Sequence, residues 1–140
     1  MLVGWKEYIE LTELSARLRI AKLDTGALTG CLGVETFETF DIGTSAHVKF
    51  KLAKTIVEPA PDWHILPIRE WRLVRNSSGQ EEKRPLIETM IKLGAQSHRL
   101  EFTLSRRSNM RTKVLLGRNT LRAFGYQVDP SRTYRLGRGS

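Results

Sequence analysis

The chain has little of what many protein classes depend on. Cys31 is the only cysteine among 140 residues, so no internal disulfide can form, and this fits a reducing compartment. No apolar run approaches the roughly 20 residues that a membrane-spanning helix needs, and the first residues lack the pattern of a signal peptide. We therefore expect a cytoplasmic protein with no membrane partner.

Metal-binding and nucleotide-binding motifs are also missing. The three histidines (His47, His64 and His98) are widely spaced, and the chain contains neither a His-Glu-x-x-His nor a Cys-x-x-Cys motif. It has no Gly-x-x-x-x-Gly-Lys-Ser/Thr loop that would hold nucleotide phosphates. We expect no metal site and no cofactor.

Acidic residues are scarce, and none occurs between Glu101 and Asp129. The net charge is +8 and the pI is about 10.1, which favours attraction to polyanions, although a solvated basic surface is the ordinary meaning of such a balance. Nucleic-acid modules place aromatic side chains among the basic ones, and the basic stretch 106–113 has none, so nucleic acid is not the partner we expect. An acidic peptide would exploit this charge better than a neutral one.

The length is that of one domain with a single core, and the apolar patterning is that of a β protein. Alternation predicts an all-β fold in which a short helix, 119–124, ends at Gly125. The prolines and acidic residues of 58–62 predict an irregular exposed connection. The expected strands are 5–11, 18–23, 34–40, 46–52, 68–75, 84–92, 99–104, 114–116, 126–129 and 133–136.

Two of these strands, 68–75 and 84–92, are joined by a polar, glycine-containing stretch, 76–82. This arrangement predicts a long hairpin. Most such tips are simply exposed turns.

The strand 18–23 delivers Asp24, Thr25 and Gly26 into a turn. A carboxylate at the end of an apolar strand costs desolvation free energy unless a partner compensates it. Alone, Asp-Thr-Gly is weak evidence, because the same residues form ordinary turns.

The second motif is Leu-Leu-Gly-Arg-Asn at 115–119, followed by the short helix. With Asp-Thr-Gly-Ala at 24–27 it resembles the retropepsins, the single-domain aspartic proteases. The chain looks closer still to a bacterial branch of that superfamily that carries the label "ATP-dependent zinc protease". The closer match rests on 4–5, 23–27, 75–79, 84–85, 115–121 and 128–130. It implies one domain, 1–140, folded as a closed β-barrel with one short C-terminal helix and a flap hairpin over the substrate.

The resemblance also implies a site. Asp24 would be catalytic, and because the chain holds one such motif, a complete carboxylate pair needs a homodimer. One departure is Leu28, where retroviral enzymes commonly have an acidic residue that pairs with the late arginine, so the partner of Arg118 stays open. The implied site comprises the active-site turn Thr25, Gly26 and Ala27, the flap residues Arg75, Asn76, Ser77, Ser78 and Gly79, and the supporting residues Leu115, Leu116, Gly117, Arg118 and Asn119.

The resulting hypothesis is an aspartic endopeptidase acting on peptides or proteins, with glutamate-rich tails as a specific candidate substrate. Two things suggest that substrate. One is the basic charge, and the other, implied by the resemblance, is an association of the bacterial branch with ligases that add glutamate tails to proteins. The alternative is a catalytically silent retropepsin-like module that binds an acidic partner or nucleic acid.

Overall fold

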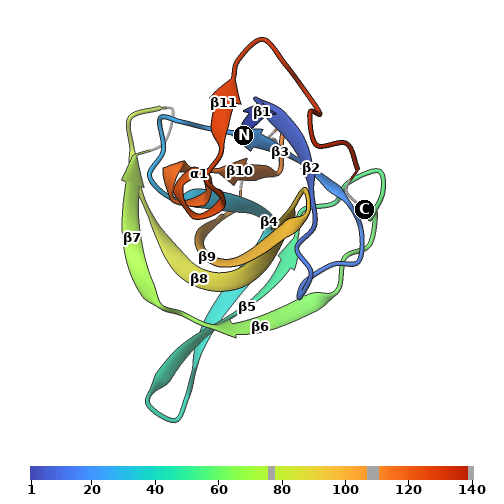
Figure 1. Cartoon of the computed structure of the whole chain (residues 1–140). Helices are drawn as coiled ribbons and strands as arrows, with labels where there is room; N and C mark the ends of the chain where they lie inside the picture. Colours follow the sequence, from blue (N-terminus) through green and yellow to red (C-terminus); the bar gives the residue numbers. More distant parts are fainter. Residues whose placement is uncertain (76–77, 107–110, 139–140) are drawn as a thin grey trace.

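The computed structural model describes residues 1–75, 78–106 and 111–138 (Figure 1). These residues form a mostly β structure with one short helix. The elements are β1 (Leu2–Gly4), β2 (Lys6–Ile9), β3 (Arg19–Leu23), β4 (Gly30–Ile42), β5 (Ser45–Leu52), β6 (Trp63–Pro67), β7 (Glu70–Arg75), β8 (Glu81–Leu93), β9 (Gln96–Ser105), β10 (Val114–Leu116), α1 (Arg118–Phe124) and β11 (Gln127–Asp129).

Nine strands belong to one sheet. Its main path runs β2-β3-β10-β4-β9-β8-β7, with β5 paired to β4 and β6 paired to β5. The long strand β4 pairs with different strands along its length. Its first residues pair with β9 and β10, and its later residues pair with β5 in a hairpin that projects from the body (Figure 1). β1 and β11 form a separate parallel pair.

In the part of the chain that the structure describes, the closed barrel expected from the resemblance is not found. Within the described residues the sheet is an open path that ends at β2 and β7. A single isolated bridge joins Glu10, just after β2, to Lys92 of β8, with N···O distances of 3.1 and 2.9 Å. After this bridge the chain turns, with the N–H of Leu14 donating to the Leu11 carbonyl at 2.9 Å, and both leucines are buried.

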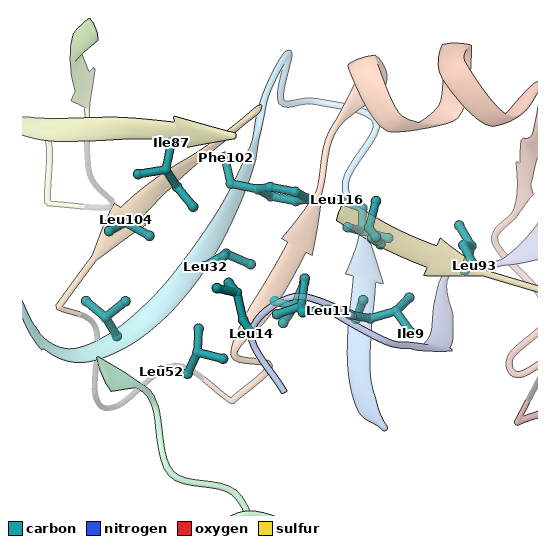
Figure 2. Packing of buried hydrophobic residues seen from close by; sticks show 14 of the residues in the cluster. Ile9, Leu11, Leu14, Leu32, Leu52, Ile87, Leu93, Phe102, Leu104 and Leu116 are labelled. Carbon is teal, nitrogen blue, oxygen red and sulfur yellow. The ribbon is translucent and has the colours of Figure 1, made fainter. Parts of the chain in front are cut away.

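The core is built from the apolar faces of these strands (Figure 2). On β5, Val48, Phe50 and Leu52 are buried, while the two lysines between them face outward, as the alternation predicted. Figure 2 shows Phe102 of β9 and Leu116 of β10 in the same cluster as Leu32 of β4. On β3, the strand that leads to Asp24, Ala21 and Leu23 belong to the same buried cluster, so this strand is anchored in the core.

The helix was predicted correctly. α1 begins at Arg118 and ends before Gly125, whose φ of 72° suits glycine and whose N–H donates to the carbonyl of Leu121. No helix in the described ranges is long and apolar enough to cross a bilayer.

The strand expected at 133–136 is wrong. The N–H groups of Arg135 and Leu136 donate to the carboxylate of Glu7, at 2.9 and 3.1 Å, instead of to a neighbouring strand. Glu7 is fully buried and also accepts the N–H of Gly4 at 2.6 Å. A buried carboxylate with these backbone donors replaces sheet pairing at this end of the chain.

Further differences concern strand bounds, because β4, β8 and β9 extend beyond the expected ranges 34–40, 84–92 and 99–104. The strand expected at 5–11 is observed only as β2, at 6–9. Trp5 before it forms a bend, and its N–H donates to the Arg132 carbonyl, while β1 on the other side of the bend was not predicted. The edge strand β6 was not predicted, because it is short and follows the proline-rich connection at 58–62, which is irregular as expected.

Candidate active site

Asp24 sits where two parallel strands end side by side. Leu23 of β3 pairs with Leu116 of β10, and the N–H of Asp24 donates to the Leu116 carbonyl at 2.8 Å. Inside the turn, the N–H of Gly26 donates to Asp24 Oδ1 at 2.9 Å, and the N–H of Ala27 donates to the Asp24 carbonyl at 3.3 Å. The half-buried carboxylate is thus held by its own turn on a rigid strand end.

The second motif lies directly against this turn. The N–H of Arg118 donates to the Ala27 carbonyl at 2.8 Å, and the N–H of Asn119 donates to the Leu28 carbonyl at 2.9 Å. A Cβ on Gly117 would lie 2.8 Å from the Leu28 oxygen, so only glycine permits this close approach. The structure brings the two sequence motifs together.

The side chains of Arg118 and Asn119 brace the same region. Arg118 Nη1 donates to the Thr25 carbonyl at 3.0 Å, which supplies the partner that Leu28 could not. Asn119 Nδ2 donates to the Glu101 carbonyl of β9 at 3.3 Å. Both side chains therefore donate to backbone carbonyls of neighbouring segments.

A cleft of about 530 Å³ opens between the Asp24 turn and the β7–β8 hairpin. The hairpin is antiparallel and pairs Arg75 with Glu81 at its outer end, so the expected hairpin is present. Arg72 Nη1 donates to Thr29 Oγ1 at 2.9 Å and joins the hairpin to the segment after Asp24. The cleft is lined by Asp24, Gly26, Ala27, Leu28, Thr29, Cys31, Arg72, Leu73, Val74, Arg75, Arg84, Thr103 and Leu115.

The expected flap residues are placed only in part. Arg75 lines the cleft, and Ser78 and Gly79 form the turn at the tip, where Gly79 has a φ of 84°. Asn76 and Ser77 lie outside the described residues.

Arg72 and Arg84 line the cleft but were not among the candidate residues. From the sequence, Arg84 belongs only to one of the stretches that carry the resemblance. Their shared face depends on the register of β7 against β8, which pairs them directly. Alternation within each strand was the available signal, but it fixes no cross-strand partner.

A metal centre finds no support in the geometry. Across residues 1–75, 78–106 and 111–138, no group of three His, Cys, Asp or Glu side chains is arranged to hold an ion.

Comparison with known proteins places the chain in a family. A family model described as "RimB-like: Retropepsin-like aspartic endopeptidase RimB" matches residues 2–138. A solved structure of a Legionella pneumophila protein of unknown function (DUF785) superposes with a TM-score of 0.81 at 22% identity, covering 96% of this chain and 97% of the other. At that identity the likeness concerns the fold alone.

Curated relatives carry a different kind of name. A "probable alpha-L-glutamate ligase" of Desulfotalea psychrophila is 29% identical over 86% of this chain, and one of Parasynechococcus marenigrum is 30% identical over 98%. The chain spans only 26% and 29% of the length of these two relatives. On the match of the family model over nearly its whole length, the chain belongs to the RimB-like family of retropepsin-like aspartic endopeptidases.

Proposed function

We propose that the chain is one subunit of a homodimeric aspartic peptidase in which Asp24 of each subunit forms the catalytic pair. The observation that carries the proposal is the position of Asp24: a carboxylate fixed by its own turn, in a cleft closed on the other side by a hairpin. The family to which the chain belongs is named for the same chemistry. A single chain contributes one such carboxylate, so the pair requires a second copy.

The mechanism follows from the proximity of two carboxylates. Two such groups a few Å apart share one proton, because both cannot readily be ionised together. The ionised member takes a proton from a water as that water attacks the peptide carbonyl. The protonated member donates to the developing oxyanion and helps to protonate the leaving nitrogen. Arg118 and Gly117 keep the turn in place during these steps.

We further propose an acidic peptide as the substrate, with glutamate-rich tails as the leading candidate. Three arginines line the cleft (Arg72, Arg75 and Arg84), and Asp24 is the one acidic residue among the described residues that line it. The curated relatives are named as ligases of L-glutamate, a residue with a carboxylate side chain. Their name is not transferred as an activity, because the chain spans little more than a quarter of their length.

The first test is cleavage of glutamate-rich and neutral peptides by the wild-type chain and by Asp24→Asn, between about pH 4 and 8, with mass spectrometry of the products. We expect cleavage by the wild type and none by Asp24→Asn, which removes the proton-sharing carboxylate but keeps the shape of the side chain. Size-exclusion chromatography and circular dichroism should show the same dimer and fold for both. Retained activity in Asp24→Asn would end the aspartic mechanism.

A chelator separates this proposal from a metal-dependent one. We expect no inhibition by EDTA, because the proposed water activation uses carboxylates alone. Inhibition that zinc reverses would overturn that expectation.

The alternative function is a silent retropepsin-like module that binds an acidic partner in the same cleft, and the cleft arginines favour it as much as they favour the enzyme. Absence of cleavage of every peptide by a folded, dimeric wild-type chain would favour this alternative. Binding of the same peptides then becomes the relevant measurement.

A further inference from the structure

Two arginines face each other across the hairpin that covers the cleft. Arg72 of β7 pairs directly with Arg84 of β8, and direct partners in an antiparallel pair project to the same face. Both side chains line the cleft that contains Asp24. Like charges directly opposite each other destabilise strand pairing, so this position needs anions nearby.

The carboxylates that pair with these arginines come from the same two strands, and their side chains are more exposed than the arginine side chains. Glu70 accepts from Arg72 Nε at 3.1 Å and from Nη2 at 2.8 Å, and Glu82 accepts from Arg84 Nη2 at 3.0 Å. The side chain of Arg84 is 6% exposed, whereas that of Glu82 is 34% exposed. Glu82 can therefore move into solvent, but Arg84 stays within the cleft wall.

Arg84 is incompletely satisfied. Within the described part of the chain its Nε is buried and has no hydrogen-bond partner. Its Nη1 lies 3.7 Å from the sulfur of Cys31, which is a weak acceptor. A buried guanidinium with an unfilled donor is costly, and the fork of its N–H groups fits a carboxylate through two parallel hydrogen bonds.

We propose that Arg84, assisted by Arg72 opposite it, forms a subsite that binds the carboxylate of an acidic side chain of the substrate. In the free chain Glu82 occupies part of this subsite. On binding, the substrate carboxylate takes the Nε and Nη2 donors of Arg84 and displaces Glu82 toward solvent. The inference rests on the proposed function, because it assigns substrate selectivity within the same cleft.

The test compares peptides that are identical except for Glu or Gln at one position, scanned along the sequence. At the position that fills the subsite, the wild type should prefer the Glu peptide by about tenfold or more in kcat/KM. Arg84→Met, which keeps the length of the stem but removes the guanidinium, should lose that preference and cleave the Gln peptide much as the wild type does. Equal loss on both peptides would mean that Arg84 serves only the structure, and would overturn the subsite.

The matched control is Arg69→Met. Arg69 carries the same charge but faces Glu88 and Glu101, at 3.7 and 3.9 Å, and does not line the cleft. We expect this variant to keep the full preference for Glu. If Arg69→Met lowers the preference as much as Arg84→Met does, overall charge rather than the subsite sets selectivity, and the inference fails.

A second variant keeps the test decisive if Arg84→Met does not fold. Glu82→Gln removes the carboxylate that bonds to Arg84 in the free chain and leaves Arg84 itself unchanged. Its KM for the Glu peptide should fall by several-fold, while its KM for the Gln peptide should stay near the wild-type value. An unchanged KM for the Glu peptide would show that Glu82 does not compete with substrate.

A binding measurement distinguishes failure of the subsite from failure of the peptidase. Fluorescence anisotropy with labelled Glu and Gln peptides is measured in the Asp24→Asn background, where no cleavage is needed. Selective binding of the Glu peptide that Arg84→Met removes would support the subsite even if the wild type cleaves nothing. Cleavage by the wild type without preference for Glu in either assay would overturn the subsite and leave the peptidase standing.

Discussion

At the scale of single residues, the candidate site depends on one close backbone approach. The carbonyls of Ala27 and Leu28 accept hydrogen bonds from the residues after Gly117, and a Cβ at Gly117 would lie 2.9 and 2.8 Å from these two oxygens. The atoms in the way are backbone, so no rotamer change relieves the overlap. Gly117 therefore couples the supporting strand to the turn that carries Asp24.

This coupling predicts the effect of Gly117→Ala. The variant should lose about 1–3 kcal/mol of unfolding free energy, because the turn and the start of α1 must move apart. Activity should fall by more than the unfolded fraction explains, since the displaced turn carries Asp24. Urea denaturation and kcat at a concentration where the variant is folded measure the two effects.

Gly43→Ala is a suitable control for Gly117→Ala. Gly43 lies at the tip of the β4–β5 hairpin with a φ of 61° and with no atom within 4 Å of an added Cβ. It should cost about 1–2 kcal/mol through backbone strain alone and leave kcat unchanged. Unaltered kcat in Gly117→Ala, at similar loss of stability, would contradict the coupling.

Residue types also explain which site residues could be found from sequence. Asp24 and Gly117 belong to two short contiguous motifs that together carry the resemblance to the retropepsins, so both could be singled out from the sequence. Arg84 lies in an ordinary-looking strand among other charged residues. Its importance comes from burial and from Arg72 opposite it, and neither can be inferred from local sequence.

At the scale of elements, the β7–β8 hairpin forms the wall of the cleft opposite Asp24. β8 is held along its other edge by β9, from Leu86 paired with Thr103 to Leu93 paired with Gln96. The outer end of the hairpin, near Arg75 and Glu81, has no pairing beyond the hairpin itself among the described strands. The fold thus depends on the base of the hairpin more than on its tip.

Shortening the tip should therefore separate binding from folding. Deletion of residues 77–79 should raise KM for peptide substrates several-fold, because main-chain contacts to an extended peptide are lost, and should change the melting temperature by only a few degrees. Thermal denaturation and steady-state kinetics of the same preparation give both values. An unchanged KM would remove the hairpin tip from the substrate site.

Elements were predicted well where patterning was regular. Strands β3, β5 and β10 and helix α1 were expected at nearly their observed bounds, because alternation and a terminal glycine mark them locally. The segment at 133–136 was mistaken for a strand because a buried carboxylate, Glu7, takes its N–H groups. Glu7 is far from this segment in the sequence, so a local pattern cannot predict the contact.

At the scale of the whole molecule, the proposed activity requires two chains. Mixing the wild type with Asp24→Asn in equal amounts and allowing subunits to exchange should lower the activity to about half that of the same amount of wild type alone, because half of the wild-type chains enter mixed dimers. Activity per chain should also fall on dilution as dimers dissociate. Additive activity in the mixture would show that one chain suffices.

The local features can be predicted from the sequence: an all-β pattern with one short helix, a glycine-containing hairpin, an acidic turn at Asp24 and a glycine motif at 115–119. These follow from alternation, turn chemistry and residue type, which act over a few neighbours. Three features follow only from the tertiary structure: the open path of the described sheet, the meeting of the two motifs at Gly117, and the shared cleft of Arg72 and Arg84. Those features depend on strand register and burial between residues far apart in the chain, and local sequence does not specify such pairings.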